Sequence, residues 1–338
     1  MLIRYSYISL NILMKKNALL ILPYFGKFNS YFDLFLESCR ANPSYDWLIL
    51  TDNCDGYDFP ANVHVIKSSL EEIKTLADKK FGFQVSLGAP YKLCDYKPAY
   101  GLLFEDLLKG YDYWGHCDCD LLFGNLEKNL TPLLRKGHDK VFAAGHLTLY
   151  RNTIENNRRF MKSHNGVEIY KVAYTTSEIY VFDEDCQIKH HTDNNVHSIF
   201  LEDGASVFTE DLSMNVSGRS AKFIRSAYDP VSRQFVCQPY QPARYYWNNG
   251  ELYSLAVKKD SDDLERNDYL YIHLQSRRMR NKVDRTKYGG IEILPDRFIS
   301  VSKIPQSARQ IKKSMIGFPY LYWMDVYCKK LKRRISKI

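Results

Sequence analysis

A continuous apolar run at residues 18–25 most constrains what this chain can fold into. The run contains no charged residue, and Pro23 and Gly26 mark its end. Strands buried on both faces of a parallel sheet read as near-continuous apolar runs, whereas half-exposed strands alternate between apolar and polar residues. We therefore expect a strand inside a parallel sheet, which places the chain in the α/β class.

The segments that follow alternate between helix and strand. A helix capped at residues 29–30 is expected to end at residues 42–43, where an Asn-Pro pair breaks it. Residues 47–51 and 63–66 predict two further strands, and a Ser-x-x-Glu capping box that begins at Ser69 predicts the next helix. The order is that of βαβ units.

A further helix and strand precede the turn that holds Asp118 and Asp120. Pro98 follows Lys97 as expected of the first helical position, and Gly110 lies past the helix end. Residues 111–117 predict a strand that runs directly into Asp118.

Three of the predicted strands end in turn-forming or polar residues. These ends are residues 23–26, 51–53 and 118–120. Ligands of open α/β sheets bind outside the carboxyl ends of the strands. We therefore expect the three stretches to converge on one rim.

The Asp118-x-Asp120 pair is the sharpest chemical feature. Two carboxylates flanking a turn can bind a hard divalent ion, which can bridge both phosphates of a nucleotide diphosphate and stabilise it as a leaving group. A solvated turn is the ordinary alternative for so common a motif. An EF-hand is excluded because Leu122 and Phe123 stand where that loop needs an oxygen ligand and a glycine.

Cysteine usage and the N-terminus indicate a cytoplasmic protein. The cysteines stand at positions 39, 54, 94, 117, 119, 186, 237 and 328, without a Cys-x-x-Cys pair, so reduced thiols are expected. The N-terminus lacks the order of a signal peptide. Met14 with the following two lysines is typical of a natural start, and residues 1–13 are treated as an uninformative extension.

The formal charge of +8 is concentrated in residues 309–338, which hold nine basic residues and one acid. Apolar and aromatic residues lie between two basic clusters there, at positions 315, 316, 318, 320, 321, 323, 324 and 327. Such a basic amphipathic tail is typical of a helix that lies on an anionic membrane surface, and its apolar part is too short to span a bilayer. A helix docked on the domain or on a partner is the alternative. A neutral body argues against nucleic acid as a partner.

Residues 111–126 resemble the hallmark segment of the GT-A glycosyltransferases, in a poorly characterised bacterial group from polysaccharide (capsule or lipopolysaccharide) gene clusters. The resemblance covers roughly residues 14–279 and includes residues 20–26, 95–98, 145–152, 182–184 and 271–275. It implies a GT-A (Rossmann-like) mixed sheet flanked by helices. It also implies that Asp118 and Asp120 belong to the metal and donor site.

The same resemblance suggests which residues meet the donor. Asp52, after Thr51, would accept an imide N–H of uracil, although a plain strand-end turn explains the pair equally well. Lys97 would meet the diphosphate or the donor sugar, oriented by Asp95, with surface solvation as the alternative. The donor-binding candidates are Pro23, Tyr24, Phe25, Thr51, Asp52, Lys97, Asp118 and Arg277.

A late histidine and an acidic pair complete the candidate site. Several metal-dependent GT-A families bring a late histidine back as a third ligand. The resemblance therefore implies that His273, which ends an apolar strand, joins Asp118 and Asp120, and imidazole suits Mn²⁺ beside carboxylates. Arg277 follows His273 closely, and its guanidinium would be useful beside a diphosphate. A satisfied core histidine is the alternative. The catalytic candidates are Glu184, Asp183 and His146. Either acid could take the acceptor proton in an inverting enzyme or orient sugars in a retaining one.

Together these features predict a metal-dependent, hexosyltransferase-like glycosyltransferase that uses Mn²⁺ or Mg²⁺. Its donor would be a nucleotide-sugar, with UDP favoured, and its acceptor a glycan or lipid-linked glycan of bacterial surface polysaccharide. The expected location is the inner face of the cytoplasmic membrane. Residues 14–308 would form the catalytic domain, with 14–125 binding nucleotide and 126–308 the acceptor, and 309–338 the tail. A glycoside hydrolase and a non-catalytic nucleotide- or sugar-binding module are the alternatives.

Overall fold

The computed structural model describes residues 16–185 and most of the chain beyond, leaving out 1–15, 186–193, 285, 287–288, 314–316 and 336–338. The expected N-terminal extension, Cys186, and the apolar residues at positions 315 and 316 lie outside the described residues. The described cysteines are all free thiols, as their spacing predicts.

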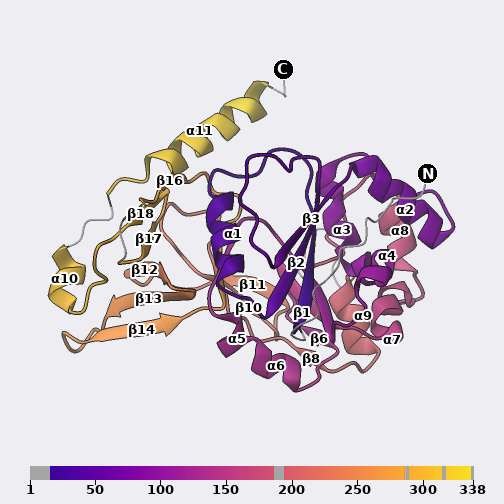
Figure 1. The fold of residues 1–338 in the computed structure, drawn as a ribbon, viewed down its shortest axis with the longest axis horizontal. Coiled ribbons are helices and arrows are strands. Elements are labelled where there is room, and N and C mark those ends of the chain that lie inside the picture. Colours follow the sequence, from indigo (N-terminus) through magenta and orange to yellow (C-terminus); the bar gives the residue numbers. More distant parts are fainter. Residues whose placement is uncertain (1–15, 186–193, 285, 287–288, 314–316, 336–338) are drawn as a thin grey trace.

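A seven-stranded mixed sheet forms the centre of the molecule (Figure 1), with strand order β3-β2-β1-β4-β7-β6-β8. Its strands are β1 Ala18–Pro23, β2 Tyr45–Thr51, β3 Val63–Lys67, β4 Tyr113–Cys117, β6 Lys140–Val141, β7 Leu147–Arg151 and β8 Val207–Phe208. Strands β3, β2, β1 and β4 run parallel, whereas β7 pairs with β4 in the antiparallel sense. The mixed α/β class expected from the sequence is confirmed.

Strand β1 is buried on both faces, as its apolar run predicts. Leu19 and Ile21 belong to the core on one side of the sheet, and Leu20 and Leu22 to the core on the other. Helices α2, α4 and α9 contribute to the first core, and α1 and α6 to the second. Each fully buried Leu or Ile of this kind contributes about 1.5–3 kcal/mol of transfer free energy to folding.

The helices of this half agree with the sequence in part. Ser69 and Glu72 form the predicted capping box of α2. Helix α1 begins at Phe32, and its N-cap residue Tyr31 makes no side-chain cap. The Asn29 side chain accepts the Tyr31 N–H at 3.0 Å and donates to the Cys119 carbonyl. The helix expected from Lys97 is broken, because Pro98 lies inside a longer helical stretch and lacks the N–H that would continue its ladder.

The helical segments that precede the C-terminal tail are short. They are α1 Phe32–Arg40, α2 Leu70–Phe81, η1 Pro90–Lys92, α3 Leu93–Tyr96, η2 Lys97–Ala99, α4 Tyr100–Leu103, η3 Glu105–Leu107, α5 Leu126–Asn129, α6 Thr131–Arg135, α7 Ile154–Arg158, η4 Arg159–Met161, α8 Ile169–Thr175 and α9 Val196–Glu202.

Three smaller sheets are formed by the second half of the chain together with the short strand β5. A six-stranded sheet has the order β14-β13-β12-β17-β18-β16, a three-stranded sheet the order β5-β15-β9, and β10 pairs with β11. Their bounds are β5 Leu121–Phe123, β9 Met214–Asn215, β10 Ser226–Asp229, β11 Gln234–Cys237, β12 Ala243–Asn248, β13 Glu251–Val257, β14 Leu264–Asp268, β15 Tyr271–His273, β16 Arg280–Lys282, β17 Ile291–Leu294 and β18 Arg297–Ser300. A separate apolar core joins the six- and three-stranded sheets to α1.

The C-terminal tail forms α10 Ala308–Lys313 and α11 Tyr320–Ile335. Helix α11 projects from the body (Figure 1), and Phe318, Tyr320 and Tyr327 are more than 60% exposed. Leu321 is buried, so the start of the helix is docked on the domain. Among the described residues, no helix is both long and apolar enough to cross a membrane.

Candidate metal and substrate site

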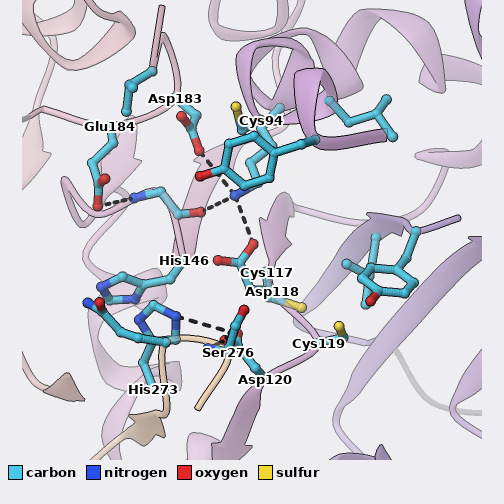
Figure 2. Close-up of a pocket in the computed structure, with 18 of the residues that line it drawn as sticks. Cys94, Cys117, Asp118, Cys119, Asp120, His146, Asp183, Glu184, His273 and Ser276 are labelled. Atoms are coloured by element: carbon cyan, nitrogen blue, oxygen red, sulfur yellow. Dashed lines mark hydrogen bonds and ion pairs between the residues drawn. The ribbon is translucent and has the colours of Figure 1, made fainter. Parts of the chain in front are cut away.

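A cavity of about 1040 Å³ lies at the carboxyl ends of β1 and β4 (Figure 2). Pro23, Tyr24 and Phe25 line it after β1, and residues 118–120 line it after β4. The end of β2 does not reach it. Thr51 is fully buried, and Asp52 accepts the Gly26 N–H at 2.7 Å, so the expected three-strand rim is a two-strand rim.

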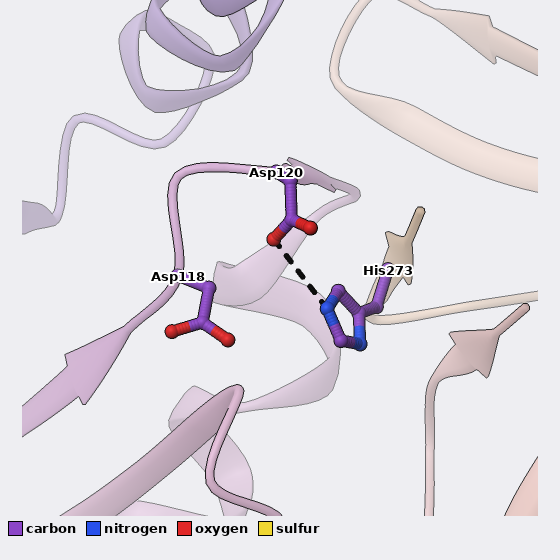
Figure 3. Close-up of side chains that lie close together, drawn as sticks. All are labelled: Asp118, Asp120 and His273. Atoms are coloured by element: carbon purple, nitrogen blue, oxygen red, sulfur yellow. Dashed lines mark ion pairs between the residues drawn. The ribbon is translucent and has the colours of Figure 1, made fainter. Parts of the chain in front are cut away.

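Asp118, Asp120 and His273 all line this cavity and form a cluster, drawn in Figure 3. One ligand atom from each lies within 4.8 Å of the others. The two acids flank the turn between β4 and β5. His273 reaches them because β15 pairs with β5, opposite Leu121. A long-range strand pairing thus brings together the three residues expected to hold a metal.

The hydrogen bonds around His273 prepare one ring nitrogen for a metal. Its Nδ1 lies 3.0 Å from Asn215 Oδ1, and the Asn215 amide nitrogen donates to the Ser226 carbonyl. That network assigns the imidazole proton to Nδ1. Nε2, which lies 3.4 Å from Asp120 Oδ1, is then the lone-pair atom facing the acids. A metal-ligating histidine usually donates its other ring nitrogen in this way.

The charges of the cluster suit a cation. Burial alone would raise the pKa of Asp120, but His273 and the Ser276 backbone N–H together lower it. Burial likewise opposes charge on His273, yet the Asp120 carboxylate raises its pKa, so a metal that takes Nε2 would displace a proton from the ring. Two carboxylates and one imidazole are a donor set that fits Mn²⁺ and is acceptable to Mg²⁺.

The backbone after His273 adopts an unusual turn. Gln275 and Ser276 have φ of 50° and 52°, the left-handed region that costs non-glycine residues roughly 1–2 kcal/mol each. In this conformation the Ser276 N–H donates to Asp120 Oδ2, and its hydroxyl lies 3.4 Å from the same oxygen. The strained turn therefore holds one carboxylate of the cluster.

Lys97 connects the metal cluster to a second acidic pair. Its ammonium lies 2.8 Å from Asp118 Oδ1, 3.1 Å from Asp183 Oδ2 and 2.9 Å from the Gly145 carbonyl (Figure 2). Burial opposes its charge, but the Asp118 and Asp183 carboxylates raise the pKa well above the usual value. Asp95 does not orient Lys97, because it accepts from Lys92 and from two backbone N–H groups of residues 180–182.

Asp183 and Glu184 face the same cavity in a less polar setting. Burial raises the pKa of Asp183 to about 6, with the Lys97 ammonium working against the rise. Burial and the neighbouring Asp183 raise the pKa of Glu184 to about 7. Gly145 permits this arrangement, because a Cβ there would collide with the Asp183 carboxylate. Its N–H donates to Glu184 at 3.3 Å.

His146 lies between the two acidic groups. Its Nδ1 is 2.8 Å from the Tyr271 hydroxyl, and the centre of its ring lies 4.4 Å from the centre of the His273 ring. Burial lowers its pKa well below the usual value, so the ring is neutral. Nε2 is buried and has no hydrogen-bond partner among the described residues.

The model of a family described as "Family of unknown function (DUF6625)" matches residues 20–302. The chain belongs to this family. All candidate site residues lie within the DUF6625 match, whereas α10 and α11 lie beyond it.

Other comparisons add little. No curated protein matches the chain. Among solved structures, the apo form of mouse xyloside xylosyltransferase 1 is 10% identical, with a TM-score of 0.34. The match covers 60% of this chain and 88% of that one. A likeness this weak does not establish a shared activity.

Arg277 does not lie where a donor diphosphate was expected. Its buried guanidinium donates to the backbone carbonyls of residues 217, 220, 221 and 295, and does not line the cavity. It was expected beside the diphosphate because it lies close to His273 in the sequence. The intervening turn reverses the direction of the chain, so the two side chains diverge.

Several residues of the site were not predicted. Asn215 and Ser276 hold His273 and Asp120, but no local pattern marks them, because their roles depend on the pairing of β15 with β9 and on a backbone turn. Gly145 stood within a segment of the family resemblance. Its packing against Asp183 still required the fold to be seen.

Proposed function

We propose that this member of DUF6625 is a metal-dependent glycosyltransferase of the GT-A type. It transfers a sugar from a nucleotide-diphosphate donor, with a UDP-sugar favoured, to a glycan or lipid-linked glycan. The pathway we infer is synthesis of bacterial surface polysaccharide, capsule or lipopolysaccharide. The enzyme is expected to be hexosyltransferase-like.

The observation that carries this proposal is the Asp118–Asp120–His273 cluster at the carboxyl edge of parallel strands, in a cavity large enough for a nucleotide-sugar. A divalent cation there would neutralise the charge of a departing diphosphate. The hydrogen bond from His273 to Asn215 supports a metal role over that of an ordinary core histidine.

The donor would lie between the cation site and the end of β1. Pro23, Tyr24 and Phe25 supply the wall there, and Lys97 supplies the ammonium nearest to Asp118. Lys97 is well placed to meet a phosphate oxygen or a donor hydroxyl once a ligand competes for its contact with Asp118. Nucleobase contact by Thr51 and Asp52 would require a rearrangement of the Gly26 turn.

The acceptor would enter beside Asp183 and Glu184. Asp183 is paired with Lys97, so we assign Glu184 the role of taking the acceptor hydroxyl's proton. A carboxyl group with a pKa of about 7 can hold or release a proton at neutral pH, which general acid–base catalysis requires. His146 also lines the cavity and is the third catalytic candidate.

The tail supports a peripheral location on the inner face of the cytoplasmic membrane. Helix α11 presents exposed Trp323 and Tyr327 beside exposed Lys329 and Lys330. Aromatic and basic residues on one projecting helix favour an anionic lipid surface.

The test is a turnover assay with a panel of nucleotide-sugars, measuring nucleotide release with Mn²⁺, with Mg²⁺ and with chelator. We expect metal-dependent release that is fastest with a UDP-sugar and that increases when a glycan acceptor is added. Metal-dependent binding without turnover for any donor would indicate a binding module. Glycan cleavage without a nucleotide would indicate a hydrolase.

A further inference from the structure

The turn that follows His273 contacts the C-terminal segment through Arg277, which does not line the cavity. The guanidinium carbon of Arg277 lies 4.8 Å from the centre of the Tyr322 ring and 5.4 Å from that of Phe223. Phe223 belongs to the core of the second half, and Tyr322 to the first turn of α11. Arg277 is therefore held between the body and the tail.

Arg277 is also fixed by hydrogen bonds. Its NH1 donates to the carbonyls of Ala221 and Pro295, at 3.2 Å each, and its NH2 to those of residues 217 and 220, at 3.1 and 2.7 Å. The side chain is only 7% exposed. Five N–H donors in a rigid plane make a guanidinium suited to binding several carbonyls at once.

The backbone of Arg277 closes the strained turn. Its N–H donates to the Leu274 carbonyl at 2.9 Å, across Gln275 and Ser276 with their positive φ angles. Leu274 in turn donates to the Asp120 carbonyl at 3.2 Å, and Ser276 donates to the Asp120 side chain. Strained backbone persists only when its surroundings hold it, and Arg277 is the anchor at one end of this turn.

The start of α11 is itself attached to the domain. Leu321 is 5% exposed, and its N–H lies 3.4 Å from Asp296 Oδ2. The Tyr322 hydroxyl lies 3.4 Å from the Gly218 carbonyl. These contacts place the Tyr322 ring against Arg277, although the rest of the helix projects away (Figure 1).

From this chain of contacts we propose that Tyr322 and Arg277 are positioning residues for the metal site, so that the first turn of the C-terminal helix is required for full metal affinity. The inference rests on the proposed cation site at Asp118, Asp120 and His273. Neither positioning residue touches the ion. They hold the turn that orients Asp120 and follows His273, and loss of such outer contacts typically costs about 10–100-fold in metal affinity.

The experiment measures Mn²⁺ dissociation constants of the full-length protein by titration with electron paramagnetic resonance detection of free Mn²⁺. Tyr322→Ala is compared with Tyr322→Phe, which keeps the ring, and with Tyr320→Ala, which removes a 68% exposed ring of the same helix. Arg277→Lys, which keeps the charge but loses the planar fork, is compared with Arg278→Ala at an exposed neighbour. Melting temperatures in chelator monitor the fold.

We expect Tyr322→Ala and Arg277→Lys to weaken Mn²⁺ binding about tenfold or more. Tyr322→Phe, Tyr320→Ala and Arg278→Ala should bind Mn²⁺ as the wild type does. Wild-type affinity in both Tyr322→Ala and Arg277→Lys would overturn this inference and leave the metal site standing. Failure of the wild-type protein to bind Mn²⁺ would overturn the metal site, and this inference with it.

Discussion

Asp120 and Glu184 line the same cavity, yet their surroundings shift their pKa values in opposite directions. Both carboxyl groups are largely withdrawn from water, which favours the protonated form. Around Asp120, His273 and the Ser276 N–H reverse that effect. Around Glu184, the Gly145 N–H at 3.3 Å does not, and the neighbouring Asp183 adds to the rise.

The difference shows how one cavity can serve two kinds of chemistry. A carboxylate kept ionised by His273 and the Ser276 N–H suits a cation, whereas a carboxyl group with a pKa of about 7 suits proton transfer at neutral pH. Lys97 lies between the two sides and contacts Asp118 and Asp183.

Removing the charge of Asp120 from the proposed cation site should have the largest effect on metal affinity and turnover. Asp120→Asn deletes one of two carboxylates and weakens the interaction with His273, so we expect Mn²⁺ affinity and donor turnover to fall by at least about 100-fold. Asp55→Asn, at an exposed turn, is the matched control. Full turnover by Asp120→Asn in the nucleotide-release assay would mean that Asp120 has no special role. The contrast between Asp120 and Glu184 would then be lost.

Replacing Glu184, the residue assigned to proton transfer, should change how the free energy of unfolding depends on pH. Between pH 4.5 and about 7 the folded protein keeps a proton on Glu184 that the unfolded chain has released. The free energy of unfolding therefore falls as pH rises through this window and stays lower above it. Glu184→Gln removes that penalty and should stabilise the protein at pH 8 by at most about 3 kcal/mol, with the gain vanishing near pH 4.5.

Urea unfolding in chelator at pH 5 and at pH 8 measures this effect. Glu210→Gln, at an exposed glutamate, supplies the control and should show no such pH dependence. A Glu184→Gln variant that is destabilised equally at both pH values would mean that the Glu184 carboxyl group is ionised in the folded state. The contrast with Asp120 would then be lost.

Loss of the end of the C-terminal tail should leave both the cation site and Glu184 unchanged, but should weaken membrane binding. Deleting residues 324–338 retains Leu321, Tyr322 and Trp323 but removes six basic residues. We expect binding to phosphatidylglycerol vesicles to weaken at least about tenfold, since each basic residue near an anionic surface contributes roughly 1 kcal/mol. Binding by the full chain should itself weaken with salt. Co-sedimentation unchanged by the deletion would exclude the tail as the membrane anchor.

The sequence predicts the central sheet well because its signals are local. The apolar run of β1 and the capping box of α2 each depend on a few adjacent residues, and both occur as predicted. The single helix expected from Lys97 fails because the periodicity did not show that a helical stretch already began at Pro90. Strand ends are visible in a sequence. Their lateral order, which sets Thr51 and Asp52 apart from the cavity, is not.

The candidate site divides in the same way. Asp118 and Asp120 are two residues apart and could be recognised together, and His273 joined them by resemblance. The positions of Arg277, Asn215 and Ser276 depend on a left-handed turn and on the pairing of β15 with two distant strands. Neither leaves a pattern in the nearby sequence, so the roles of these residues emerge only from the fold.

The most direct test of the metal-dependent donor site is a thermal-shift measurement with UDP, with and without Mn²⁺, against GDP and CMP. A ligand present at 100 times its dissociation constant stabilises the folded state by about 2.7 kcal/mol, which is several degrees for a chain of this size. We predict that UDP with Mn²⁺ raises the melting temperature most, that chelator removes most of the rise, and that Asp120→Asn abolishes it. Equal shifts for UDP with Mn²⁺ and with chelator would contradict the account, because nucleotide would then bind without the cation that Asp118, Asp120 and His273 are proposed to hold.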